Sequence, residues 1–207
     1  MPLTLVDAHT HHAPQPAGSA IENVSPAAWN PRAGALYSVG IHPWEAQENI
    51  NLAPLIAIAS HPQVAAIGET GLDKLRGAWG QLPLFREQIL LSEQVEKPLI
   101  IHCVKMSDLL LEVRREMKPR QPWILHGFRG KPQEACQWLA HGLYLSIGEH
   151  FNEAALGEIP LNHLLVESDE SELPISQIYD RIAHVLGLSA QALTGEVTAN
   201  LERLFVR

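Results

Sequence analysis

Short apolar runs alternate with longer helical patterns along this chain, and this alternation most constrains how the chain can fold. The runs are four to seven residues long and apolar on both faces, which is typical of parallel strands covered by helices. They span residues 3–9, 36–41, 64–68, 98–102, 123–126, 143–147 and 164–167. Helices are expected at about 52–60, 82–96, 107–117, 132–140, 176–186 and 189–204. Repeated strand–helix units predict an α/β fold with a parallel sheet.

The expected sheet is a TIM-barrel-like (β/α) barrel, small or incomplete. An eight-unit barrel typically needs about 250 residues, with roughly 200 as the lower limit, and this chain has 207. Only seven strands are recognisable. Residues 13–35 carry four prolines and are expected to form a loop, in which Trp29 could cover the gap left by a missing unit. No linker or repeat divides the sequence, so we expect a single domain, residues 1–207.

Five of the predicted strands end in residue types that bind metals. These residues are His9 and His11, Glu69, His102, His126 and Asp169. The carboxyl ends of parallel barrel strands face one mouth, where active sites lie. A lone histidine or His-x-His pair is often structural, but six compatible residues at the same end of successive strands predict one metal-binding pocket.

This set of ligands points to metal-dependent hydrolysis. Four imidazoles and two carboxylates suit zinc, manganese, iron or nickel better than calcium, which prefers oxygen ligands. Six ligands suffice for two metal ions if one carboxylate bridges them, and two adjacent metals form a recognised hydrolytic site.

Charge, hydropathy and cysteine count narrow the class of protein and its expected location. The formal net charge of −8 argues against a protein that coats nucleic acid, but not against a nuclease whose metals supply positive charge. No apolar run is long enough for a transmembrane helix, and residues 1–7 lack the pattern of a secretory signal. Two cysteines are too few for a disulfide framework. A cytoplasmic protein without membrane contact is therefore expected.

Several segments, in order along the chain, resemble the TatD family of metal-dependent hydrolases. They are Val6-Asp7-Ala8-His9-Thr10-His11, Val39-Gly40-Ile41-His42-Pro43, Ala66-Ile67-Gly68-Glu69-Thr70-Gly71-Leu72-Asp73, Gln81 with Phe85, Pro98-Leu99-Ile100-Ile101-His102, His126-Gly127-Phe128-Arg129-Gly130, Leu164-Leu165-Val166-Glu167-Ser168-Asp169 and Asn200-Leu201-Glu202-Arg203-Leu204-Phe205. The resemblance implies an amidohydrolase-like barrel and a divalent-metal phosphodiesterase that typically acts on DNA from an end.

The resemblance also implies a role for each residue of the pocket. His9, His11 and Asp169 would hold one metal, His102 and His126 the other, and Glu69 would bridge the two. Asp169 would orient the attacking water or accept its proton, so Asp169 and Glu69 are the expected catalytic residues. The cofactors would be two divalent ions of zinc, manganese or magnesium. His42, Lys105 and Arg129 are weaker candidates for substrate contacts.

The chain also departs from the family pattern. It is short, and what would be the second strand and its helix are not recognisable. The family motif Ser-Arg-Asp after the fourth strand is replaced by Cys103, Val104 and Lys105, and Asp169 is followed by the acidic Glu170 and Glu172.

Three hypotheses follow from these observations. The first is a two-metal hydrolase of phosphate esters, either small molecules or a DNA end. The second keeps the metals but takes a small ester, amide or lactone, because Glu170 and Glu172 would repel a polyanion. The third is a non-catalytic binding protein that uses an open sheet edge left by the missing unit. The sequence predicts neither the physiological metal nor the oligomeric state.

Overall fold

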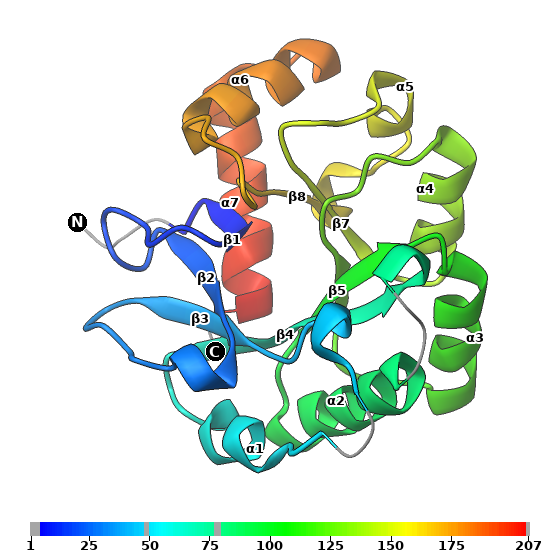
Figure 1. The fold of residues 1–207 in the computed structure, drawn as a ribbon. Helices are drawn as coiled ribbons and strands as arrows, with labels where there is room; N and C mark the ends of the chain where they lie inside the picture. Colours follow the sequence, from blue (N-terminus) through cyan, green and yellow to red (C-terminus); the bar gives the residue numbers. More distant parts are fainter. Residues whose placement is uncertain (1–4, 48–49, 77–79, 206–207) are drawn as a thin grey trace.

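Eight parallel strands form a single sheet in the computed structural model, which describes residues 5–47, 50–76 and 80–205. The strands follow one another around the sheet in chain order (Figure 1). They are β1 (Asp7–Thr10), β2 (Ala20–Val24), β3 (Leu36–Val39), β4 (Val64–Asp73), β5 (Leu99–Val104), β6 (Trp123–Leu125), β7 (Tyr144–Ile147) and β8 (Leu164–Val166). The barrel expected from the sequence is therefore confirmed, with eight strands rather than seven. Of the first predicted strand, residues 3 and 4 lie outside the described part.

The barrel closes between its first and last strands. Thr10 and Asp169 form a parallel bridge. The Asp169 amide donates to the His9 carbonyl at 2.9 Å, and the His11 amide donates to the Asp169 carbonyl at 3.0 Å. Below this bridge, the buried carboxylate of Asp7 accepts hydrogen bonds from the amide and hydroxyl of Ser168. These contacts leave no open sheet edge here for a partner, so the reason for the third hypothesis falls away.

Strand β2 lies inside the segment that the sequence analysis assigned to a loop, and that assignment was wrong. The prolines stand on both sides of Ala20–Val24, which leaves a run that can pair with both neighbours. Ile21 aligns with Leu36 and Val24 with Val39. The second strand is thus present, and only its helix is missing. Residues 11–19 contain no helix, and residues 25–35 contain only the three-residue 3-10 helix Pro26–Ala28.

A loop takes the place of that helix. The Trp29 ring packs edge-on against Tyr37 of β3 and against His61, at 5.2 Å between ring centroids in each case. Arg32 pairs with Glu22 of β2. Trp29 therefore packs against β3 in the region where the helix is absent, although the strand that the sequence analysis took to be missing is present.

Helices cover the rest of the barrel (Figure 1). They are α1 (Ala53–Ala59), α2 (Gln81–Val95), α3 (Ser107–Met117), α4 (Pro132–Ala140), α5 (Glu153–Leu156), α6 (Ile175–Leu186) and α7 (Ala190–Phe205). All except the short α5 were expected. The strands are buried on both faces, as in Ile100 and Ile101, which explains their continuous apolar runs. No helix of the described part is long and apolar enough to cross a membrane.

One buried side chain of α2 connects the helical layer to the mouth of the barrel. The amide of Gln88 accepts from the Ile41 N–H at 2.8 Å and donates to the Ile41 carbonyl at 3.0 Å. It also donates to the hydroxyl of Thr70. Ile41 precedes His42 and Thr70 follows Glu69, so Gln88 holds the backbone beside two residues of the predicted pocket.

We expect Gln88→Met to lower the free energy of unfolding by about 2–5 kcal/mol, because it leaves the buried N–H and C=O of Ile41 without partners. The melting temperature should fall by roughly 5–15 °C. Thermal and urea unfolding measure both quantities, with Gln137→Met on the exposed face of α4 as the matched control. Equal stability of the two variants would contradict this account.

Candidate metal centre

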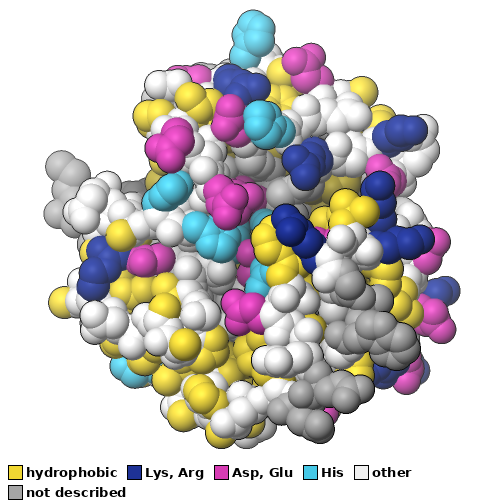
Figure 2. Space-filling model, viewed as in Figure 1, with side chains coloured by type: hydrophobic (Ala, Val, Ile, Leu, Met, Phe, Trp, Pro, Cys, Tyr) yellow, Lys and Arg dark blue, Asp and Glu magenta, His cyan; other side chains and the backbone are white. Residues whose placement is uncertain are grey.

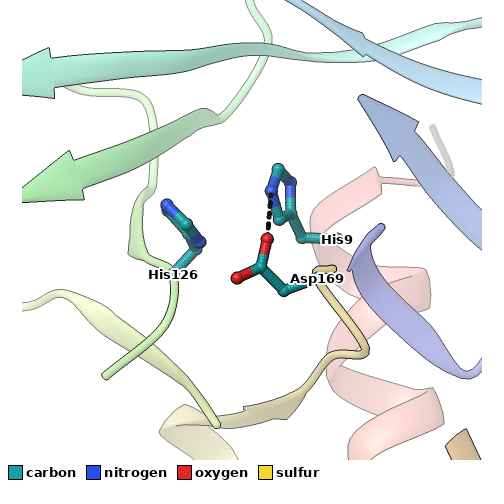
Figure 3. Close-up of side chains that lie close together, drawn as sticks. All are labelled: His9, His126 and Asp169. Carbon is teal, nitrogen blue, oxygen red and sulfur yellow. Dashed lines mark ion pairs between the residues drawn. The ribbon is translucent and has the colours of Figure 1, made fainter. Parts of the chain in front are cut away.

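The six residues predicted to bind metal lie together at the carboxyl ends of the strands. His9 belongs to β1, Glu69 to β4 and His102 to β5. His11 and His126 come directly after β1 and β6, and Asp169 comes three residues after the end of β8. Figure 3 shows His9, His126 and Asp169 pointing toward one another across the mouth of the barrel.

Glu69 is the centre of this cluster and is only 3% exposed. Its Oε1 atom lies 2.8 Å from Nδ1 of His102 and 2.7 Å from Nε2 of His126. Its Oε2 atom lies 3.5 Å from Nε2 of His9 and 3.4 Å from Nε2 of His11. The two carboxylate oxygens therefore face different sets of imidazole nitrogens.

Asp169 joins the pair formed by His9 and His11. Its Oδ1 atom lies 3.7 Å from His9 Nε2 and 3.6 Å from His11 Nε2. Its backbone is left-handed, with φ of 53°, a conformation that costs a non-glycine residue about 1–3 kcal/mol. The two hydrogen bonds that close the barrel hold this backbone in place, so barrel closure also aims the Asp169 carboxylate.

Glycines allow the strands to approach closely around Glu69. A Cβ atom on Gly40 would lie 2.7 Å from the backbone of Gly68, the residue before Glu69. Gly71 has φ of 147°, and a Cβ atom there would lie 1.9 Å from the carbonyl oxygen of His102. The Gly-Glu-Thr-Gly motif therefore sets the distance between β4 and β5 where the two strands carry site residues.

The charges in the cluster favour a cation. Burial alone would raise the pKa of Glu69, but the imidazoles of His126, His102 and His11 lower it well below its ordinary value. Burial alone would lower the pKa of His126, but Glu69 and Glu167 raise it well above its ordinary value. Glu69 is thus ionised and attracts positive charge, either as protons on the imidazoles or as metal ions.

The ligand atoms of these residues have the chemistry and the spacing that suit a divalent metal. Both ring nitrogens of His9 are buried and make no hydrogen bond to any described residue, although a buried polar atom normally has a partner. Three groups of three residues place their ligand atoms within 4.8 Å of one another: His9, His126 and Asp169; His9, His11 and Glu69; His42, Glu69 and His102. Mixed nitrogen and oxygen ligands suit zinc and other transition metals.

Three further carboxylates support the histidines. Asp73 accepts from His102 Nε2 at 3.2 Å, which leaves Nδ1 of that ring directed at Glu69. The fully buried Glu167 lies 3.5 Å from His126 Nδ1. Asp7 accepts the His9 amide, and burial raises the pKa of Asp7 to about 7. Carboxylates that orient ligating histidines in this way are common at metal sites.

Two contacts of Glu69 were not predicted. Asn23 of β2 accepts hydrogen bonds from the Glu69 amide at 2.8 Å and from the Ser38 hydroxyl at 3.0 Å. His42 places Nε2 3.0 Å from Glu69 Oε1, whereas the sequence suggested only a substrate contact. Asn23 could have been predicted from its place near the carboxyl end of β2, where the other site residues follow their strands, but only if β2 had been recognised as a strand.

The other predicted substrate contacts lie in a cavity beside the cluster. Lys105 and Arg129 line this cavity of about 720 Å³ together with His102 and His126. Glu170 lines it as well. Figure 2 looks onto this face, where histidine and acidic side chains gather near the centre, with basic side chains next to them.

Comparison with known proteins identifies the family. The family model described as TatD related DNase matches residues 20–206. The chain belongs to the TatD family. Its match begins at β2, so His9 and His11 precede the matched range and join the cluster through the fold.

Relatives of this TatD-family chain include enzymes from several bacteria. A "3'-5' ssDNA/RNA exonuclease TatD" from Cronobacter turicensis is 32% identical over 206 residues, which cover 84% of this chain and 78% of that protein. The "uncharacterized metal-dependent hydrolase YabD" of Bacillus subtilis is 28% identical and covers 81% and 76%. The crystal structure of the TatD homologue YJJV from Escherichia coli shares the fold, with a TM-score of 0.84, 20% identity and 99% of each chain covered. The chain is accordingly a metal-dependent hydrolase of TatD type.

We expect Asn23→Leu to weaken divalent-metal binding by roughly 10–100-fold, because partners of metal ligands have effects of this size. The substitution leaves the Glu69 amide without an acceptor. Asn23→Asp keeps an acceptor oxygen and should retain most of the affinity. Competition with a chromophoric chelator measures the affinity, and melting curves of the metal-free variants separate it from stability. Equal affinities of the two variants would contradict a role through the Glu69 amide.

Proposed function

We propose that the cluster holds two divalent metal ions that share Glu69. His9, His11, Asp169 and Glu69 Oε2 would hold one ion, and His102, His126 and Glu69 Oε1 the other. The observation that carries this proposal is the two-sided environment of Glu69, in which Oε2 faces His9 and His11, whereas Oε1 faces His102 and His126 and also contacts His42. The nitrogen-rich ligand set favours zinc or manganese over magnesium.

The proposed reaction is hydrolysis of a phosphodiester bond. When bound, the two metals would polarise the phosphate and lower the pKa of a water molecule. Asp169 is 38% exposed on the cavity side and would orient that water and accept its proton on a carboxylate oxygen. Glu69 is buried and would remain an ionised bridge. Lys105 and Arg129 line the cavity and would bind phosphate oxygens.

The proposed substrate is the end of a single-stranded nucleic acid or a smaller phosphate ester. The relatives named as 3'-5' exonucleases of single-stranded DNA and RNA support this choice. We place the activity in the cytoplasm, because Cys103 and Cys136 are both free thiols, as in a reducing compartment.

A small ester, amide or lactone is the second candidate. Glu170 lines the cavity next to Asp169 and would repel the phosphates of a long polyanion. A substrate panel separates the two candidates. Turnover of carboxylic esters without turnover of phosphodiesters would favour the second.

We expect two metal ions per chain after reconstitution with zinc or manganese, and a loss of both in a His9→Ala/His102→Ala double variant. The reason is that each single change removes a ligand from a different ion. Elemental mass spectrometry of untagged protein gives the stoichiometry. One ion per chain would overturn the bridged pair in favour of a mononuclear site.

We expect His102→Ala to lower the turnover of a phosphodiester at least about 100-fold, because even partners of metal ligands cost 10–100-fold when removed. The melting temperature of the metal-free protein should change little. His184→Ala on the exposed side of α6 is the matched control and should retain full activity. Unchanged rates in His102→Ala would contradict the proposed function.

A further inference from the structure

The rim of the mouth carries exposed apolar surface that the six site residues do not explain. Trp44 is 52% exposed and Leu75 is 64% exposed. The guanidinium carbon of Arg76 lies 4.4 Å from the centre of the Trp44 ring. Leu75 also lines the 720 Å³ cavity next to His102. An exposed indole, an exposed leucine and a cation therefore lie together at the entrance to the candidate centre.

The Trp44 ring is held in place although half of it faces solvent. Its Nε1 atom donates to Asp73 Oδ2 at 2.6 Å, and Asp73 is only 2% exposed. Its backbone amide donates to Nδ1 of His42 at 3.1 Å. A core role does not account for a large aromatic side chain that is fixed by its polar edge and remains 52% exposed.

Trp44 is also close to the reacting centre. Its ring centroid lies 4.6 Å from that of His42 and 5.9 Å from that of His102. The Asp73 oxygen that accepts the indole N–H also accepts from His102 Nε2. A group bound against this rim would therefore lie beside the phosphate that the metals are proposed to hold.

We propose that Trp44 and Arg76 form a stacking subsite for a nucleobase next to the scissile phosphate. This inference rests on the proposed function. Planar bases stack on indole rings and on guanidinium planes whatever their sequence, since every base has a π face. The positive charge of Arg76 also favours a nucleotide, whose base is joined to a phosphate.

The binding test uses the fluorescence of the 207-residue protein reconstituted with metal, and a strand with phosphorothioate linkages that resist hydrolysis. The probe is a five-nucleotide thymidine strand. Wild-type protein should show a saturable change of fluorescence that Trp44→Phe and Trp44→Leu lack. A change that persists in both variants would come from other tryptophans and would overturn the assignment.

The activity test compares two short single strands, one with a normal terminal nucleotide and one whose terminal base is replaced by an abasic site. The wild type should prefer the normal end by about tenfold in kcat/KM, from the usual strength of base stacking. Trp44→Leu should lose this preference, mainly through KM, and Trp44→Phe should keep most of it. Leu90→Ala, an exposed apolar change on α2, should leave the preference intact.

The two Trp44 variants separate stacking from the support of Asp73. Both lose the N–H donor to Asp73, but only Trp44→Leu loses the ring. If both lose the preference equally, the indole acts through Asp73 and His102, and the stacking proposal is wrong. Failure of the proposed function gives a different result: neither strand is hydrolysed by the wild type, while the binding test still reports on Trp44.

Discussion

A buried carboxylate surrounded by five imidazoles is the constraint on which the rest of this structure depends. Glu69 is 3% exposed, and the rings of His9, His11, His42, His102 and His126 each approach its oxygens within 3.5 Å. Burial of an unpaired charge would cost far more than a domain of this size can offset. The charge is tolerated because four chain segments bring these imidazoles to it, and a parallel barrel brings the ends of its strands to one place.

The barrel meets this requirement with fewer helices than a full eight-unit barrel. The barrel keeps all eight strands, including β2, because Asn23 of that strand accepts a hydrogen bond from the Glu69 amide. What it reduces is the outer layer, where Trp29 and the Arg32–Glu22 pair cover β2 and β3. Closure between β1 and β8 cannot be relaxed in the same way, since it places His9, His11 and Asp169 on one side of Glu69.

The sequence predicts those parts of the molecule that rest on a local pattern. Continuous apolar runs predicted seven of the eight strands, and metal-ligand residue types at the ends of the runs predicted the six residues that the structure brings together. Strand β2 was missed because its run is short, contains Glu22 and Asn23, and lies between prolines. The bond from Trp44 to Asp73 joins residues 29 positions apart, and no local periodicity encodes it. The same holds for the contact between His42 and Glu69, which depends on the register between β3 and β4.

The net charge of −8 affects how an anionic substrate can reach the candidate metal centre. An acidic chain can bind an anionic substrate only where positive charge is concentrated, because its overall field opposes association. Arg76, Lys105 and Arg129 follow β4, β5 and β6, three neighbouring strands at the mouth. Glu149 and Glu170 follow β7 and β8 on the other side of the same cavity. Positive charge from metals held around Glu69 would add to the basic side, so binding of an anion at this mouth depends on the centre itself more than on the protein surface.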